Sequence, residues 1–355
     1  MDNTKKIAAL LPPDIDAVIV TDPTVRFWLT GFHSTAGTLI VARAASCLII
    51  DFRYIEAARA AVTQSRVVLQ AKTAEQTVEF LREVGAENVA FLDDKVTVRA
   101  AEEYRKQFEG FNLVFDSRAA QLISEAQMIK SEDELAIMRR AQDVTDAALA
   151  AVLPQIKVGV TDREIAVSLE YEMKRRGAQG TSFDFIVVSG AESSKPHGVP
   201  TDKKIREGEF VTMDIGAICD GYCSDMTRTV CVGQPTDEMK KVYDTVATAQ
   251  LMALAAIAPG KRCCDIDKIA RDYIYSNGYQ GCFEHGLGHS LGVLVHEPPA
   301  FSPRCQTVLQ PGMVMTVEPG IYLAGRFGVR IEDVVFVTPD GCENITRSPK
   351  RLLTL

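Results

Sequence analysis

An Asp-Gly dipeptide at positions 220 and 221 divides the segment FVTMDIGAICDGYCSDMTRTVCV into two β-rich runs. Asp-Gly between such runs is a strong signal for a β-hairpin with a two-residue loop. That loop would place Asp214 opposite Thr227 and Asp225 on the same face, two residues from Thr227. The two carboxylates would then be diagonal neighbours about 7–8 Å apart at Cα, within reach of two cations about 3.5–4 Å apart. The alternative is an exposed hairpin with two solvated acids.

Histidines cluster in the segment EHGLGHSLGVLVHEPP, which begins at residue 284. His285 and His289 are four residues apart and His296 follows, so three of the five histidines lie within twelve residues. The glycines beside them disfavour a helix and favour backbone that another group approaches closely. We interpret this cluster as part of a site rather than as buried structural histidines.

Two more carboxylates stand in strand-like contexts. Glu318 ends the run MVMTVE just before Pro319, which should end the strand and leave the carboxylate at its tip. Glu332 lies inside the β-like segment GVRIEDVVFV, with Arg330 two residues earlier on the same face. An acid in an apolar strand is unfavourable to bury unless it is paired or bound to metal. A surface pair between Arg330 and Glu332 is the alternative.

These motifs supply a candidate ligand set for metal: Asp214, Asp225, His289, Glu318 and Glu332. Four converging carboxylates would repel one another and raise some of their pKa values, whereas two divalent cations would balance the four negative charges. A ligand set that is rich in oxygen and has one imidazole suits Mn²⁺ better than it suits zinc, which is often bound by thiolates. Water between two such ions loses a proton near neutral pH, which indicates metal-assisted hydrolysis.

The chain has 355 residues, which at about 150 residues per domain indicates two domains. Short apolar runs alternate with helical stretches over residues 1–122, and this pattern predicts an α/β domain. A capping box from Ser131 to Glu134 predicts the first long helix of a second domain over residues 126–355. A second capping box, from Thr161 to Glu164, predicts another helix.

Charge and composition exclude several partners. A net charge of −8 offers no basic surface for nucleic acid or for an anionic membrane. The first apolar stretch is broken by Pro12 and Pro13, unlike a signal peptide, and no apolar run approaches the length of about 18 residues that a membrane span needs. The nine cysteines are scattered, without a C-x-x-C pair. We therefore expect reduced thiols and a cytoplasmic protein.

The order Asp-(ten residues)-Asp, His-Gly-Leu-Gly-His, Val-Glu-Pro-Gly and Arg-Ile-Glu-Asp resembles that of the pita-bread metallopeptidases. Within them it is most similar to the branch of prolidase and aminopeptidase P, which cleaves Xaa-Pro bonds. The resemblance covers nearly the whole chain. It implies an α+β pita-bread catalytic domain over residues 126–355 and a creatinase/prolidase-like N-terminal domain of α/β type over residues 1–122. The segment RFWLTGF is close to a recurring sequence of that N-terminal domain.

The same resemblance implies a role for each site residue. Asp214 would bind one metal ion and His289 with Glu318 the other, while Asp225 and Glu332 would bridge both ions. Three histidines would orient the substrate carbonyl and assist proton transfer: His197, His285 and His296. Tyr322 and Arg330 would form the surrounding hydrogen bonds. Arg304 lies where prolidases carry an arginine for the carboxylate of a C-terminal proline.

The implied enzyme is a metallo-exopeptidase that uses two divalent ions per chain, with Mn²⁺ favoured over Co²⁺ or Zn²⁺. A bridging hydroxide would attack the scissile carbonyl, and Glu318 would relay the proton to the proline nitrogen. The expected substrates are small peptides with proline at the second position, and the expected assembly is a homodimer. Dipeptidase and aminopeptidase P specificity both stay open. Two alternatives compete with this interpretation. One is a non-catalytic pita-bread module that binds peptides or proteins. The other is a creatinase-like amidinohydrolase, although enzymes of that kind lack the full set of metal ligands.

Overall fold

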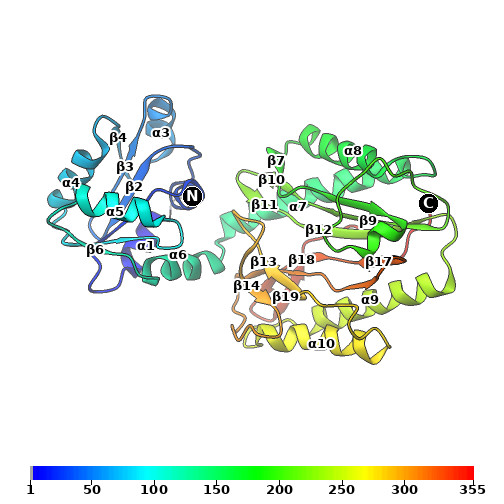
Figure 1. Ribbon diagram of the computed structural model, residues 1–355. Coiled ribbons are helices and arrows are strands. Elements are labelled where there is room, and N and C mark those ends of the chain that lie inside the picture. The colour runs from blue at the N-terminus through cyan, green and yellow to red at the C-terminus, as the bar shows by residue number, and fades with distance from the viewer. Residues whose placement is uncertain (1–2) are drawn as a thin grey trace. The chain divides into compact units, whose positions relative to one another are not determined.

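The computed structural model describes residues 3–355, in two compact units that meet between Gln127 and Met128. The first unit contains these elements, in chain order (Figure 1): α1 (Thr4–Leu10), β1 (Ala17–Val20), α2 (Pro23–Thr30), β2 (Thr38–Ala42), β3 (Ser46–Ile50), α3 (Ile55–Ala61), β4 (Arg66–Leu69), α4 (Thr73–Glu83), β5 (Asn88–Phe91), α5 (Val98–Gln107), β6 (Asn112–Val114) and α6 (Arg118–Met128). α6 runs through the boundary that the sequence analysis placed between residues 122 and 126.

The first unit is built on one mixed sheet with the strand order β4-β3-β2-β1-β5-β6. β1 pairs antiparallel with β2 and parallel with β5, so the expected α/β domain is confirmed. The apolar runs of the sequence form the four strands β1, β2, β3 and β5, which are buried along almost their whole length. The two edge strands, β4 and β6, are short and partly exposed, and neither is marked by a continuous apolar run in the sequence.

The second unit carries the remaining elements, in chain order: α7 (Glu132–Val152), η1 (Leu153–Gln155), α8 (Asp162–Arg175), β7 (Gly180–Thr181), β8 (Ile186–Ser189), η2 (Gly190–Ser194), β9 (Glu209–Ile215), β10 (Ala217–Cys219), β11 (Tyr222–Cys223), β12 (Met226–Val232), α9 (Asp237–Ala256), α10 (Cys263–Ser276), β13 (Gly288–Ser290), β14 (Glu297–Phe301), β15 (Val314–Val317), β16 (Gly320–Leu323), β17 (Phe327–Arg330), β18 (Asp333–Thr338) and β19 (Gly341–Asn344). Both expected capping boxes are present at the starts of α7 and α8.

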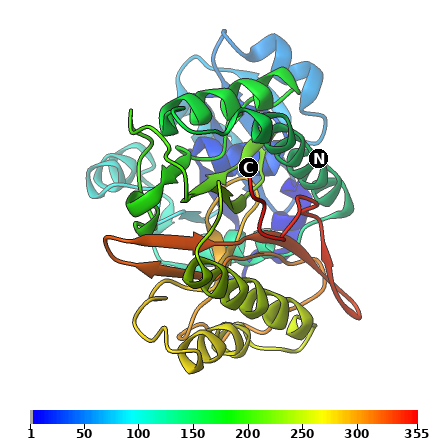
Figure 2. The ribbon, with the colours of Figure 1, turned by 90° about the vertical axis from the view of Figure 1, so that its right-hand side faces the viewer.

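Helices cover the strands of the second unit on both sides. α7 and α8 pack together on one side, and α9 and α10 pack together on the other (Figure 1 and Figure 2). Leu149 and Leu169 of the first pair share a buried core with Met213 of β9. Val246 and Ile274 of the second pair belong to another core. None of the helices between residues 3 and 355 combines the length and the apolar character that a membrane span requires.

The hairpin register expected from the Asp-Gly turn is confirmed. Asp214 pairs with Thr227, and Cys219 pairs with Tyr222 on either side of the two-residue loop. Asp220 has φ 42° and Gly221 has φ 79°, as a tight hairpin turn requires. Gly216 separates β9 from β10, and a Cβ at this position would lie 2.1 Å from the carbonyl oxygen of Ser224. The close approach of these two backbones therefore requires glycine.

One local expectation is wrong. The segment around Glu332 is not one continuous strand, because β17 ends at Arg330 and β18 begins at Asp333. In the gap, the Glu332 backbone N–H donates to the carbonyl oxygen of Thr227, 3.0 Å away, on a neighbouring strand. The Glu332 carboxylate also accepts a hydrogen bond from the Thr227 hydroxyl, at 2.7 Å. These contacts turn the residue out of the strand and fix its side chain.

Candidate metal centre

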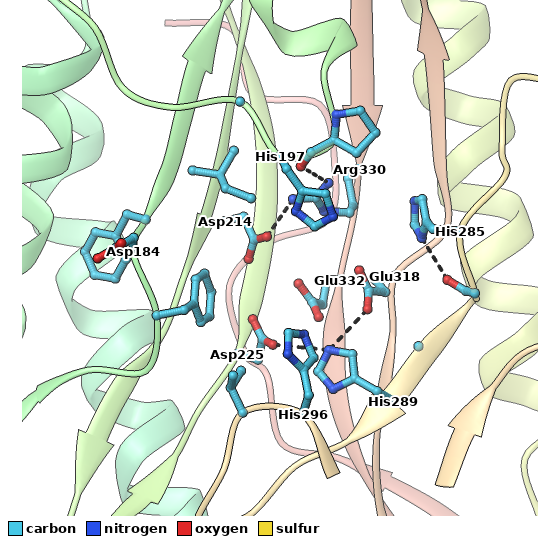
Figure 3. A pocket seen from close by; sticks show the side chains of 18 of the residues that line it. Asp184, His197, Asp214, Asp225, His285, His289, His296, Glu318, Arg330 and Glu332 are labelled. Carbon is cyan, nitrogen blue, oxygen red and sulfur yellow. Dashed lines mark hydrogen bonds and ion pairs between the residues drawn. The ribbon is translucent and has the colours of Figure 1, made fainter. Parts of the chain in front are cut away.

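Five acidic and imidazole side chains converge from separate elements of the second unit (Figure 3). They line a cavity of about 670 Å³. Three carboxylates come from β9, from the residue just before β12 and from the gap after β17. The imidazole comes from β13, and the fourth carboxylate from the residue just after β15. They are the five residues of the sequence-derived ligand set: Asp214, Asp225, His289, Glu318 and Glu332.

The imidazole of His289 presents a lone pair to two carboxylates. Its Nδ1 lies 3.1 Å from the carbonyl oxygen of Ser290, which can only accept, so Nδ1 carries the proton in the neutral ring. Nε2 then faces Glu318 Oε1 at 3.4 Å and Asp225 Oδ2 at 3.6 Å. A lone pair and two carboxylate oxygens repel one another unless a proton or a metal cation lies between them.

The donor atoms fit a metal ion by proximity and by lack of other partners. Ligand atoms of Asp225, His289 and Glu332 all lie within 4.8 Å of one another. Among the described residues, no group donates a hydrogen bond to the buried Oδ1 atoms of Asp214 and Asp225. Buried carboxylate oxygens are ordinarily hydrogen-bonded or bound to metal. The residues present therefore fit a metal group.

The electrostatics of the protein without metal lead to the same interpretation. Burial, followed by the charges of Glu332, Asp214 and Glu318, raises the pKa of Asp225 well above its ordinary value. Burial and the neighbouring carboxylates also raise the pKa of Glu332, and burial raises that of Glu318 to about 8. Burial lowers the pKa of His289, which keeps the ring neutral and able to bind metal. Bound cations would balance the negative charges of the carboxylates and so remove their mutual repulsion.

Arg330 organises one edge of the site. Its guanidinium donates to Asp214 Oδ2 at 2.6 Å and to the Tyr322 hydroxyl at 2.8 Å. It also donates to the Thr227 hydroxyl at 3.0 Å, and that hydroxyl in turn donates to Glu332. The alternative of a surface pair between Arg330 and Glu332 is not what forms, because Arg330 pairs directly with Asp214 and is linked to Glu332 only through Thr227.

A hydrogen-bonded chain leads from this arginine to His285. Nδ1 of His285 lies 2.8 Å from the carbonyl oxygen of Gly286, and Nε2 lies 3.0 Å from the Tyr322 hydroxyl. Because the carbonyl accepts from Nδ1, Nε2 accepts from Tyr322, and the tyrosine oxygen accepts from Arg330. Burial lowers the pKa of His285 to about 4 and raises that of Tyr322 to about 12. The chain therefore stays in one protonation state at neutral pH.

The other residues expected at the site are His197, His296 and Arg304, and not all of them line the cavity. His197 is exposed and lines the cavity, and Figure 3 shows it beside Arg330, on the other side of the carboxylates from His289 and His296. The rings of His289 and His296 meet edge to face, with centroids 4.4 Å apart. Arg304 does not line the cavity. It lies in an exposed turn two residues after Ser302, which does.

Several further residues that line the cavity were not among the predicted site residues. The lining also includes the apolar side chains of Phe183, Phe185 and Val199, together with Asp184, which is labelled in Figure 3. These residues lie in ordinary-looking loop sequence, so no motif marked them. The hydroxyl of Thr316 was also missed. It donates to Glu318 at 3.3 Å and accepts from the backbone N–H of His289 at 3.0 Å.

Known proteins resemble this chain over both of its units. Residues 136–339 match metallopeptidase family M24, and residues 7–129 match the creatinase/prolidase N-terminal domain. An Xaa-Pro dipeptidase of Pyrococcus horikoshii is 34% identical over 355 residues, with 99% of each chain covered.

Solved structures of two specificities are similar to this chain. An Xaa-Pro dipeptidase from Bacillus anthracis has a TM-score of 0.92 and 37% identity, with 99% of this chain and 97% of that chain covered. An X-Pro aminopeptidase from Thermotoga maritima has a TM-score of 0.93 and 31% identity, with 99% and 100% covered. The expected two-domain architecture is confirmed.

Proposed function

The chain belongs to metallopeptidase family M24, and from that premise we propose that it hydrolyses the bond before proline in small peptides with proline at the second position. The observation that carries the proposal is the convergence of five ligand residues, two with unpartnered buried oxygens, in a cavity large enough for a short peptide. The relatives named as Xaa-Pro dipeptidase and X-Pro aminopeptidase support the proline preference.

Two divalent ions, with Mn²⁺ as the preferred metal, would be held by Asp214, Asp225, His289, Glu318 and Glu332. Asp225 and Glu332 would contact both ions. The oxygen-rich ligand set supports Mn²⁺ over thiolate-seeking metals, with Co²⁺ and Zn²⁺ as substitutes. When bound, such ions polarise a carbonyl group and lower the pKa of water.

The protein's own groups prepare the site for hydrolysis. Arg330 and Thr227 hold Asp214 and Glu332 in fixed orientations, so the ligands need little rearrangement. Glu318 would take the proton of the attacking water at its carboxylate and pass it to the proline nitrogen. His197 and His296, on opposite sides of the carboxylates, would hydrogen-bond the substrate (Figure 3). His285, held neutral by burial, would fix Tyr322 at the edge of the site.

The bond before proline imposes a particular recognition problem. Its nitrogen carries no N–H, so the protein cannot recognise it through a hydrogen bond from the amide. The apolar side chains of Phe183, Phe185 and Val199 in the cavity lining offer contacts for the pyrrolidine ring instead. Arg304 does not line the cavity, but its turn follows Ser302 of the lining, and from there it would bind the carboxylate of a C-terminal proline if the enzyme is a dipeptidase, through the paired hydrogen bonds of a guanidinium.

The proposal also covers the oligomeric state of the protein and its location in the cell. We propose a homodimer, which the family resemblance implies. We also propose a cytoplasmic location, supported by nine cysteines that are all free thiols and all lie within residues 3–355. Size-exclusion chromatography with light scattering tests the dimer, and fractionation of cells tests the location.

The activity is tested by assaying metal-loaded protein on Ala-Pro, Ala-Pro-Ala and Ala-Ala. We expect cleavage of one or both proline peptides and slow or no cleavage of Ala-Ala. Cleavage of Ala-Pro alone would identify a dipeptidase, and faster cleavage of Ala-Pro-Ala would identify an aminopeptidase. Binding of all three peptides without turnover would contradict the proposal and favour a peptide-binding module. Turnover of creatine would favour a creatinase-like amidinohydrolase.

A further inference from the structure

A buried lysine contacts the segment that carries two of the site's histidines. Lys130 lies just before α7, and its side chain is only 2% exposed. Its ammonium nitrogen Nζ lies 3.0 Å from Glu297 Oε2 and 3.3 Å from Ser290 Oγ. Burying a lysine and a glutamate is unfavourable unless each is paired, so the contact is specific rather than incidental.

Glu297 holds the loop that precedes it. Its Oε1 accepts a hydrogen bond from the Leu294 backbone N–H, at 3.1 Å. A Cβ at Gly292 would lie 2.7 Å from Glu297 Oε2, so the loop packs closely around this carboxylate. The Gly292 carbonyl accepts from the Cys223 backbone N–H at 2.8 Å, which ties the loop to β11. The Glu297 side chain therefore helps to fix the conformation of the loop formed by residues 291–296.

The two partners of Lys130 are the chain neighbours of the two imidazoles. Ser290 follows His289, and Glu297 follows His296. Ser290 and Glu297 also pair with each other where β13 meets β14, at a β-bulge. The Ser290 carbonyl accepts the proton of His289 Nδ1 and so fixes that ring. One ammonium group thus holds both ends of the loop that places the two rings 4.4 Å apart.

We propose that Lys130 is a positioning residue, which through Ser290 and Glu297 holds the imidazoles of His289 and His296 in the geometry that metal and substrate require. The catalytic part of this inference rests on the proposed function. The competing explanation is that the buried pair stabilises the fold and has no specific effect on the rings. Lys130→Met removes the charge and keeps most of the side-chain volume, so it separates the two explanations.

The first readout is independent of activity. Ring-nitrogen NMR of chelator-treated protein resolves few signals, because the chain has five histidines. In Lys130→Met we expect the ring signals of His289 and His296 to shift or broaden as their tautomers and orientations become mixed. The signal of His33, in the other unit, should stay unchanged and serves as the internal control. Assignments come from single His→Gln variants.

A matched control is available in the same unit. Lys203 also contacts one serine and one glutamate, with Nζ 2.7 Å from Ser189 Oγ and 2.6 Å from Glu209 Oε2, and it does not line the cavity. Lys203→Met should lower the thermal midpoint but leave the signals of His289 and His296 in place. Lys130→Met should also lower kcat on Ala-Pro at least tenfold, corrected for the folded fraction, whereas Lys203→Met should change kcat less than twofold.

If Lys130→Met does not fold, Glu297→Gln replaces it, because the amide keeps an oxygen for the Leu294 N–H and loses the charge that Lys130 binds. Unchanged ring signals of His289 and His296 in the folded variant would overturn the proposal. Equal shifts in Lys203→Met would also overturn it, because they would indicate general destabilisation. If the wild-type protein cleaves no proline peptide, the proposed function fails, but the NMR comparison still decides the role of Lys130.

Discussion

The carboxylate cluster predicts that the metal-free protein loses stability as the pH rises through neutrality. Glu318 has an ordinary pKa of 4.5, which burial in the folded protein raises to about 8. The folded state therefore keeps a proton that the unfolded state has lost, and unfolding becomes easier as the pH approaches 8. Burial lowers the pKa of His285 and His289, which gives the opposite slope below about pH 6.5, where unfolded histidines are protonated.

The informative window is thus about pH 6.5–8.5, across which the carboxylate contribution exceeds the small remaining contribution of His285 and His289. Within it, a folded-state pKa of about 8 for Glu318 corresponds to a loss of about 2 kcal/mol of unfolding free energy. For a domain of this size that loss lowers the thermal midpoint by about 4–8 °C. Asp225 and Glu332 titrate together with Glu318, so the slope belongs to the cluster as a whole.

Calorimetry across this window, with chelator or with excess Mn²⁺, tests the prediction. We expect the midpoint of the chelated protein to fall with pH, and that of the metal-loaded protein to be higher and nearly flat, because the ions favour the ionised carboxylates. Glu318→Gln should reduce the slope of the chelated protein. A flat midpoint after confirmed metal removal, or an undiminished slope in Glu318→Gln, would refute the reasoning.

Three further substitutions give distinct outcomes. Asp225→Asn should bind fewer than two metals per chain by elemental analysis and lower kcat by orders of magnitude, and two metals with near-normal turnover would show that Asp225 is not a bridging ligand. Arg304→Ala should weaken Ala-Pro hydrolysis mainly through KM, by about 1.5–3 kcal/mol, and affect Ala-Pro-Ala less. Equal losses on both peptides, or none, would remove Arg304 from the proposal. Gly288→Ala should lower the unfolding free energy by more than about 3 kcal/mol, because its Cβ would lie 2.1 Å from the Thr316 carbonyl oxygen. Gly180→Ala, with no atom within 4 Å of its Cβ, is the control in denaturant unfolding.

The hairpin shows why part of the site could be predicted from sequence. An Asp-Gly turn fixes the register, and the register alone places Asp214 opposite Thr227. The histidine motif excluded a helix because of its glycines, and β13 forms there as a short strand. These are local rules, in which a turn type or a backbone requirement acts over a few residues.

Much of the remaining site depends on contacts between distant segments, which no local pattern encodes. The strand break at Glu332 arises from hydrogen bonds to Thr227, more than a hundred residues earlier in the chain. Lys130 is separated from Glu297 by 167 residues, and nothing in the sequence around either residue indicates that they meet. Asp184 reaches the cavity through the path of a loop. Tertiary packing determines such contacts.

The central claim is that these residues form a two-metal centre, and anomalous scattering from a crystal soaked in Mn²⁺ tests it most directly. We expect two peaks in the cavity, one beside Asp214 and one beside His289 and Glu318, with Asp225 and Glu332 in contact with both. No peak in the cavity, or manganese bound only elsewhere on the chain, would contradict the claim.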